Sequence, residues 1–161
     1  MLARNTDWRQ GNLLTCEAAA TLGLVGATDQ GRRVIVITHD CDLPQDSELC
    51  VEVIVAELVV KDPKPDPQLS YAKNPRRLHL AYEATDAVPL ILELRHGDRR
   101  SVPKGDFAER AVKDNSLALQ VDARRGWHWG GAEFLQRLGP DFHRSATYYS
   151  NAPHTGRSGV N

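Results

Sequence analysis

The feature that most constrains the fold is the run of β-branched residues Val34-Ile35-Val36-Ile37, which leads directly into a polar cluster. An uninterrupted apolar run of this kind is typical of a strand that is covered on both faces. Residues 39–42 contain a histidine, a cysteine and two aspartates, and loops at strand ends commonly carry functional residues. We therefore expect a central strand over residues 33–38, with the candidate site at its end.

Further strands are expected on both sides of this one. Residues 50–60 are rich in valine and isoleucine and predict a second strand, antiparallel to the first and joined to it by a polar loop. Apolar and polar residues alternate over residues 77–82 and 90–95, which predicts two half-buried strands. Gly97-Asp98 predicts a hairpin turn from the second of these into a strand at residues 99–102.

Shorter elements complete the pattern. Gly11 permits a tight turn that opens a short first strand, and the alanine-rich residues 17–21 predict one helical turn. Residues 105–113 predict a helix with Asp106 as its N-cap. Its apolar stripe would consist of Phe107, Ala108, Ala111 and Val112.

The C-terminal part is expected to add one helix and a tail. Asp122 is a candidate cap for a helix that runs to about Leu138. Residues 150–161 are polar and rich in glycine, serine and asparagine, so we expect them to be disordered. Residues 1–149 then form a single domain. The pattern predicts an α+β fold: a small antiparallel, strongly bent or SH3-like barrel sheet with one or two C-terminal helices.

The composition excludes several classes of protein. With 41% hydrophobic residues and a formal net charge of -1, bulk electrostatics indicate neither a nucleic-acid nor a membrane partner. The sequence shows no signal peptide and no apolar segment long enough to span a membrane, which favours a cytoplasmic protein. Its three cysteines form no C-x-x-C pair, which argues against a disulfide framework.

The basic residues are distributed unevenly. The chain has fifteen arginines and five lysines, and the arginines form doublets at 32–33, 76–77, 99–100 and 124–125. A GC-rich genome explains the preference for arginine without any function. Guanidinium groups also suit phosphate recognition, and convergence of the doublets in space would favour that interpretation.

The polar cluster allows two kinds of chemistry. If strand geometry continues past Thr38, Asp40 and Asp42 share one face, where they could hold a divalent metal ion with Glu52 as a third ligand. The alternative is that an aspartate only ties its own backbone in a turn.

The opposite face would carry His39 and Cys41, with Cys50 at the start of the next strand. These residues could bind zinc, or the histidine could activate the cysteine as a nucleophile. The structural alternative is a buried core thiol beside a histidine that is bonded to the backbone.

A second polar constellation lies before the strand at residues 77–82. Asn74, Arg76 and His79 occur within six positions, and Asn-Pro forms a turn there. We expect residues 74–79 to meet the cluster at residues 39–42, because charged groups at buried strand ends need partners.

Three motifs resemble a set of uncharacterised bacterial and phage proteins. They are Trp8-Arg9-Gln10-Gly11-Asn12, Val36-Ile37-Thr38-His39-Asp40-Cys41-Asp42-Leu43 and Lys73-Asn74-Pro75-Arg76-Arg77-Leu78-His79. The resemblance spans roughly residues 7–138 and implies no activity. Asn12 stands where such proteins tend to have aspartate.

The glycine turn followed by Gly31-Arg32-Arg33-Val34 is also similar to the start of MazF/PemK-type toxin barrels. That resemblance implies an SH3-like barrel and metal-free RNA cleavage by arginine and a hydroxyl group. It carries over only to Arg9, Gly11 and Arg33, and this chain has Arg33-Val34 where those toxins have Arg-Pro.

These observations predict a protein that binds or acts on nucleic acid or nucleotides, in a toxin-antitoxin system or in phage defence. Arg9, Arg33 and Arg76 would hold phosphate, with Asn74 and His79 beside them. His39, Asp40 and Asp42 would form the reactive centre. The alternative is a non-enzymatic partner of another protein, such as an immunity protein, an antitoxin or a phage-encoded inhibitor, whose polar cluster is structural.

Overall fold

The structure is a computed structural model and describes residues 2–59, 77–84 and 87–119. Within these residues the chain forms six antiparallel strands, two α-helices and one 3-10 turn. Several predicted features lie outside the described residues: Asn74, Arg76, the helix at 122–138 and the tail at 150–161.

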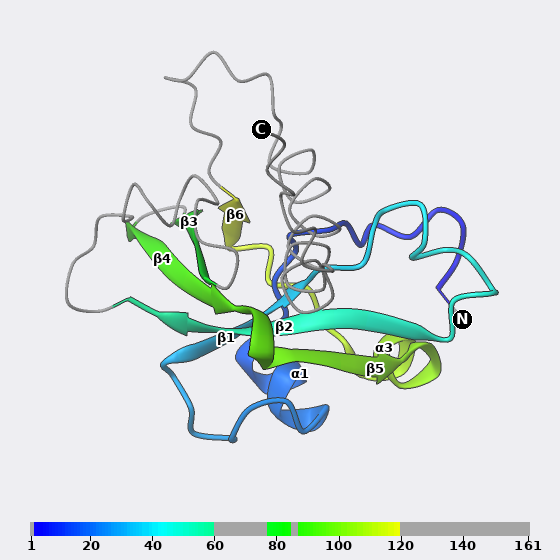
Figure 1. Ribbon diagram of the computed structural model, residues 1–161, viewed down its shortest axis with the longest axis horizontal. Coiled ribbons are helices and arrows are strands. Elements are labelled where there is room, and N and C mark those ends of the chain that lie inside the picture. Colours follow the sequence, from blue (N-terminus) through cyan, green and yellow to red (C-terminus); the bar gives the residue numbers. More distant parts are fainter. Residues whose placement is uncertain (1, 60–76, 85–86, 120–161) are drawn as a thin grey trace, which may run out of the picture.

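The strands form one curled antiparallel sheet (Figure 1). Its main path runs in the order β1 (Arg32–Val36), β2 (Cys50–Leu58), β4 (Ala87–Arg95), β3 (Arg77–Ala84) and β6 (Leu117–Leu119). A further strand, β5 (Arg99–Pro103), pairs with β2. The predicted α+β fold with a strongly bent sheet is confirmed, and the sheet curls into a half-barrel. The strand β6, which is three residues long, was not predicted from the sequence.

The predicted hairpin at Gly97-Asp98 is wrong. Both β4 and β5 pair with β2, β4 at Glu57 and Leu58 and β5 over the stretch from Cys50 to Ile54. The intervening 3-10 turn η1 (His96–Asp98) therefore does not reverse the chain; it bends the chain so that it continues along the same edge of β2. Figure 1 shows β5 beside β2 while β4 leaves it at an angle.

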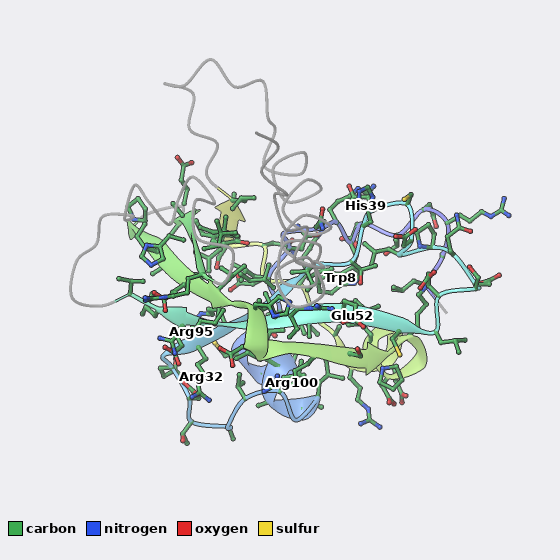
Figure 2. All side chains as sticks on the ribbon, in the orientation of Figure 1. Trp8, Arg32, His39, Glu52, Arg95 and Arg100 are labelled. Carbon is green, nitrogen blue, oxygen red and sulfur yellow. The ribbon has the colours of Figure 1, made fainter. Side chains whose placement is uncertain are left out.

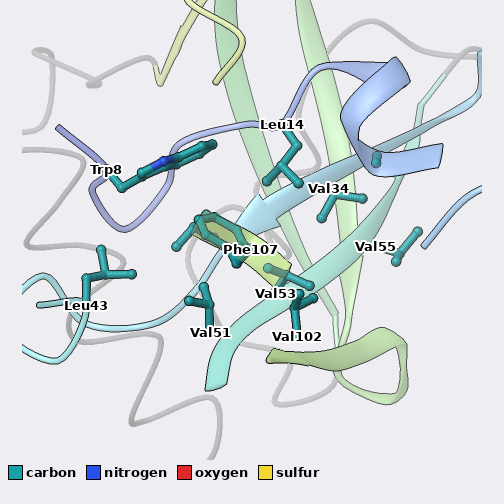
Figure 3. Close-up of a cluster of buried hydrophobic side chains, with 11 residues drawn as sticks. Trp8, Leu14, Val34, Leu43, Val51, Val53, Val55, Val102 and Phe107 are labelled. Carbon is teal, nitrogen blue, oxygen red and sulfur yellow. The ribbon is translucent and has the colours of Figure 1, made fainter. Parts of the chain in front are cut away.

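The central strands are buried on both faces, as the β-branched run predicted. Alternate side chains of β1 and β2 belong to two separate cores. The inner core contains Leu13, Ile35, Ile37, Ile54, Ala56, Leu78, Leu80, Tyr82, Leu92 and Leu94. The outer core contains Trp8, Leu14, Ala19, Val34, Val36, Leu43, Val51, Val53, Val55, Val102 and Phe107. In this outer core the rings of Trp8 and Phe107 meet edge to face with centroids 4.8 Å apart (Figure 3).

Two short helices cover the outer core. The helix α1 (Cys16–Thr21) begins where Thr15 Oγ1 accepts a hydrogen bond from the amide of Ala18, and it matches the predicted helical turn. The helix α3 (Lys104–Arg110) follows β5 directly, and its N-cap position is Pro103. The predicted cap Asp106 lies inside the first turn.

The predicted apolar stripe of this helix is only partly correct. Phe107 is fully buried, but Ala108 is exposed. The helix ends at Arg110 because Ala111 is extended, with φ -75 and ψ 130, and this leaves Val112 57% exposed.

The predicted first strand is reduced to isolated bridges. Leu13 bridges Ile35 of β1, and Leu14 bridges Lys113. Gly11 has a positive φ of 87, as expected of the tight turn that leads into this segment.

Candidate functional site

The polar segment after β1 is a tight turn. The amide of Ile37 donates to the carbonyl oxygen of Glu52 at 2.9 Å, which continues the contact with β2. The amides of Asp42 and Leu43 then both donate to the carbonyl oxygen of His39, at 2.9 and 3.1 Å. These local hydrogen bonds replace strand pairing, so the extended geometry has ended by His39.

The turn changes which side chains meet. Cys41 Sγ lies 3.3 Å from His39 Nδ1 and 3.4 Å from Asp42 Oδ1. Asp40 Oδ1 instead accepts a 2.6 Å hydrogen bond from the amide of Gln10. The prediction that both aspartates share one face, opposite His39 and Cys41, is wrong because the alternation of a strand does not apply within a turn.

Cys41 fits neither of its predicted roles well. It is exposed, so the interpretation as a core thiol is wrong. Desolvation, together with the hydrogen bond and charge of Asp42, raises the pKa of the Cys41 thiol. A nucleophilic cysteine needs the thiolate, which a raised pKa disfavours at neutral pH. The neighbouring carboxylate therefore opposes activation by His39.

The predicted metal ligands do not come together. The Glu52 carboxylate faces β5, where its Oε2 lies 3.6 Å from a guanidinium nitrogen of Arg99. In the described part of the chain, no three histidine, cysteine, aspartate or glutamate side chains are grouped so that they could hold a metal ion. The prediction of a cation site that combines Glu52 with the two aspartates is therefore wrong, as is the zinc set of His39, Cys41 and Cys50.

The polar groups around the turn hold it in place. Gln10, which is 3% exposed, donates from Nε2 to the carbonyl oxygen of Ile37 at 2.6 Å. Lys104, which is 7% exposed, donates from Nζ to the carbonyl oxygens of Asp42 at 3.2 Å and Gln45 at 2.6 Å. Buried polar and charged groups need such partners. These contacts fix the turn to the N-terminal segment and to α3.

The two predicted phosphate ligands near β1 lie at opposite ends of that strand. The amide of Gly11 donates to Val36 at the end of β1, which places the turn of Arg9 there, whereas Arg33 lies near the start. Arg9 donates to two backbone carbonyl oxygens of its own turn at 2.6 and 2.7 Å. Arg33 does the same at 2.9 and 2.8 Å. These two arginines do not form a common site.

His79 also lies away from the turn. Across the sheet, His79 lies opposite Glu93 of β4, and Glu93 lies opposite Glu57 of β2. Glu57 in turn lies opposite Arg32, at the start of β1. The prediction that residues 74–79 meet the turn is therefore wrong for His79, because β2 and β4 separate β3 from β1 and the register aligns His79 with the other end of β1.

The structure brings a different set of arginines together. Arg32, Arg77, Arg95 and Arg100 project from one face of the sheet, which we call the arginine face. Arg32 pairs with Glu57, Arg95 contacts Glu57 at 3.0 Å, and Arg77 lies directly opposite Arg95. Arg100 pairs with a β2 residue four positions before Glu57, so alternation places it on the same face.

Figure 2 shows Arg32, Arg95 and Arg100 on the same side of the sheet. Three of the four arginine doublets in the sequence each contribute one member to this face. The fourth doublet, at residues 124–125, lies outside the described residues. One described arginine from each of these three doublets therefore lies on the same face, and this set does not include Arg9 or Arg33.

A buried glutamate binds two of the arginines on the arginine face, Arg77 and Arg95. Glu93 is 7% exposed; its Oε2 accepts a hydrogen bond from Arg77 and lies 3.1 Å from His79 Nε2, and its Oε1 accepts from Arg95 Nε at 2.7 Å. Burial alone would raise the pKa of Glu93, but the hydrogen bonds from Arg77, Arg95 and His79 outweigh it and lower the pKa to about 2. Glu93 is therefore ionised at neutral pH and serves as a fixed acceptor.

Counted over the described residues, the arginine face has more guanidinium groups than carboxylates in contact with them. Arg32 lies 3.7 Å from Asp29, and the other carboxylates in contact with these arginines belong to Glu57 and Glu93. Arg100 donates only to two backbone carbonyl oxygens among the described residues. Among the described residues, these four guanidinium groups contact three carboxylates.

In the sequence, Glu93 and Arg95 are recognisable only as polar positions of an alternating strand. Their spacing in the sequence could have shown that Glu93 and Arg95 lie on the same face of their strand, because residues two apart on a strand share a face. The same spacing relates Arg77 and His79. The register between β3 and β4, which sets Arg77 opposite Arg95, is a tertiary feature.

Comparison with known proteins found no protein-family model, curated protein or solved structure that matches this chain. None of the described helices is long and apolar enough to cross a membrane. The chemistry of the two polar regions is therefore the basis for the functional inference.

Proposed function

We propose that this chain binds nucleic acid or nucleotides through the arginine face, with guanidinium groups as the phosphate ligands. The observation that carries the proposal is the convergence of Arg32, Arg77, Arg95 and Arg100 on one sheet face. Guanidinium forks match phosphate oxygens, and phosphate contacts dominate the affinity of nucleic-acid binding proteins. A local patch is needed because the chain as a whole carries a formal charge of -1.

The proposal covers binding and assigns no reaction. The predicted reactive centre at His39, Asp40 and Asp42 is used largely in contacts that fix its own turn. A cytoplasmic bacterial or phage protein of a toxin-antitoxin or phage-defence system is the context that the resemblances of the sequence suggest.

The salt dependence of binding tests the proposal. Fluorescence anisotropy with short labelled DNA and RNA duplexes should show affinity that falls steeply as salt rises, because phosphate contacts release counterions. Arg100→Ala should reduce the slope of log K against log salt by about one unit. Arg110→Ala, on α3 and outside the arginine face, is the matched control and should leave the slope unchanged. Absence of binding both to these duplexes and to nucleotides at low salt would refute the proposal.

A second candidate function is the binding of another protein without chemistry. The observation that favours it is the structural use of the polar turn: Asp40 accepts from the amide of Gln10, and Lys104 holds the carbonyl oxygens of Asp42 and Gln45. An immunity protein, an antitoxin or a phage-encoded inhibitor would need no reactive centre. This candidate gains support if the intact chain shows no affinity for nucleic acid or nucleotides at low salt.

A further inference from the structure

The pair Arg77 and Arg95 is the most unusual part of the arginine face. The two residues lie directly opposite each other on β3 and β4. Like charges in this position repel and destabilise a sheet, because directly opposed side chains start about 5 Å apart. Here Glu93 reduces the repulsion, since each of its carboxylate oxygens binds one of the two guanidinium groups.

The contacts of the pair leave donors available. Arg77 uses NH2 toward Glu93, whereas Arg95 uses Nε toward Glu93 and NH2 toward Glu57. A guanidinium group carries five N–H donors, so each arginine retains donors that have no partner among the described residues. The side chains of Arg77 and Arg95 are 48% and 47% exposed, which leaves these donors open to solvent.

We propose that Arg77 and Arg95 form a subsite for one phosphate group and that Glu93 is the positioning residue of this subsite. The inference rests on the proposed binding of nucleic acid or nucleotides and adds the place where one phosphate is held. A phosphate group offers several oxygens to two guanidinium forks, and its charge removes the repulsion between them. Glu93 holds both forks before the ligand arrives, so less side-chain entropy is lost on binding.

The substitution Glu93→Gln separates positioning from charge. It adds one positive charge to the arginine face, so a ligand that responds only to net charge should bind more tightly. A subsite that needs the carboxylate should bind less tightly, by about tenfold, which corresponds to loss of a charge-assisted contact. Glu83→Gln is the matched control, since Glu83 is an exposed glutamate on the same strand as Arg77 and has no ion pair with any described residue.

Charge-conserving substitutions give an independent measurement. Arg77→Lys and Arg95→Lys keep the charge but lose the planar fork, and each should weaken binding of a labelled DNA duplex by about tenfold. Arg110→Lys, on α3 and outside the arginine face, is the control and should change affinity by less than about twofold. If Glu93→Gln fails to fold, as judged by circular dichroism, the Arg77→Lys and Arg95→Lys variants test the subsite in its place.

Competition identifies the kind of phosphate. Inorganic phosphate or a nucleoside triphosphate should displace the duplex from the wild type if the subsite takes a terminal phosphate group. Displacement by unlabelled duplex alone indicates a backbone phosphodiester. Either result supports the subsite, provided that the Arg77→Lys variant loses the affinity in question.

Two failures can be told apart. If the wild type binds no nucleic acid or nucleotide at low salt, both the proposed function and the subsite are refuted. If the wild type binds with a steep salt dependence, while Glu93→Gln binds as tightly as Glu83→Gln and the lysine variants match the wild type, the subsite is overturned and the proposed function stands.

Discussion

The hydroxyl group of Tyr82 donates a 2.8 Å hydrogen bond to the carbonyl oxygen of Gly11, 71 positions earlier in the chain. The tyrosine is 1% exposed, and burial raises the pKa of its hydroxyl group, which stays protonated as a donor. Gly11 is in turn bonded through its amide to Val36 of β1. The contact thus joins β3 to the segment that lines β1, although β2 and β4 separate these strands in the sheet. It helps to hold the half-barrel in its curled form.

Tyr82→Phe should destabilise the protein by about 1–3 kcal/mol, because the Gly11 carbonyl oxygen would lose its buried donor while the ring packing is kept. Urea denaturation followed by circular dichroism measures this difference. A change below about 0.5 kcal/mol would show that water replaces the hydroxyl group at no cost.

The two aspartates of the turn should differ in their effect on stability. Asp40→Ala removes the acceptor of the Gln10 amide and should cost about 1–2 kcal/mol. Among the described residues, the Asp42 carboxylate contacts only the exposed Cys41 thiol, so Asp42→Ala should stay within about 0.5 kcal/mol of the wild type. Thermal unfolding of both variants gives the comparison, and equal effects would contradict the structural role of Asp40.

Lys104 should matter for stability through its ammonium group. Lys104→Met keeps much of the apolar stem but removes the charged donor to the carbonyl oxygens of Asp42 and Gln45. These oxygens keep backbone donors, the amides of Gln45 and Glu48, but lose the charge-assisted hydrogen bonds, so we expect a loss of about 1–3 kcal/mol. The matched control is Lys113→Met, which breaks a pair with the 77% exposed Asp7 and should cost less than about 1 kcal/mol. If the control proves the more harmful, the buried ammonium group is not important for the turn.

Glu93 should make stability depend on pH in the acid range. Its pKa is lowered from 4.5 to about 2 in the folded protein. The folded state therefore binds the proton less readily than the unfolded state, so the stabilisation is complete above pH 4.5 and is lost as the pH falls toward about 2. The shift corresponds to roughly 3 kcal/mol.

Urea denaturation across this pH range, with the wild type and Glu93→Gln side by side, measures the contribution of Glu93. The stability difference between the two proteins should be largest above pH 4.5 and should shrink as the pH falls. A difference that does not change with pH would show that Glu93 is not the titrating group.

The sequence alone was sufficient for the central strands and for the class of fold. The run from Val34 to Ile37 has no polar side, so it had to be buried on both faces, and the alternation in residues 77–82 required a sheet with an apolar side. These are local consequences of the two-residue period of a strand, which is visible in the chain itself. The strong bend followed from the number and shortness of the strands.

The candidate site depended on contacts that no local pattern contains. The turn at residues 39–42 broke the alternation on which the predicted metal and thiol faces relied, because its amides bond to His39 and not to a neighbouring strand. Gly97-Asp98 predicted a hairpin between the two strands that flank it, but β4 and β5 both pair with the long strand β2. The placement of Arg32, Arg77, Arg95 and Arg100 on one face, with Arg77 and Arg95 bound to Glu93, came from strand order and register. Those are decided by how whole strands bury their apolar sides against each other, so only the tertiary structure could place these charges on one face.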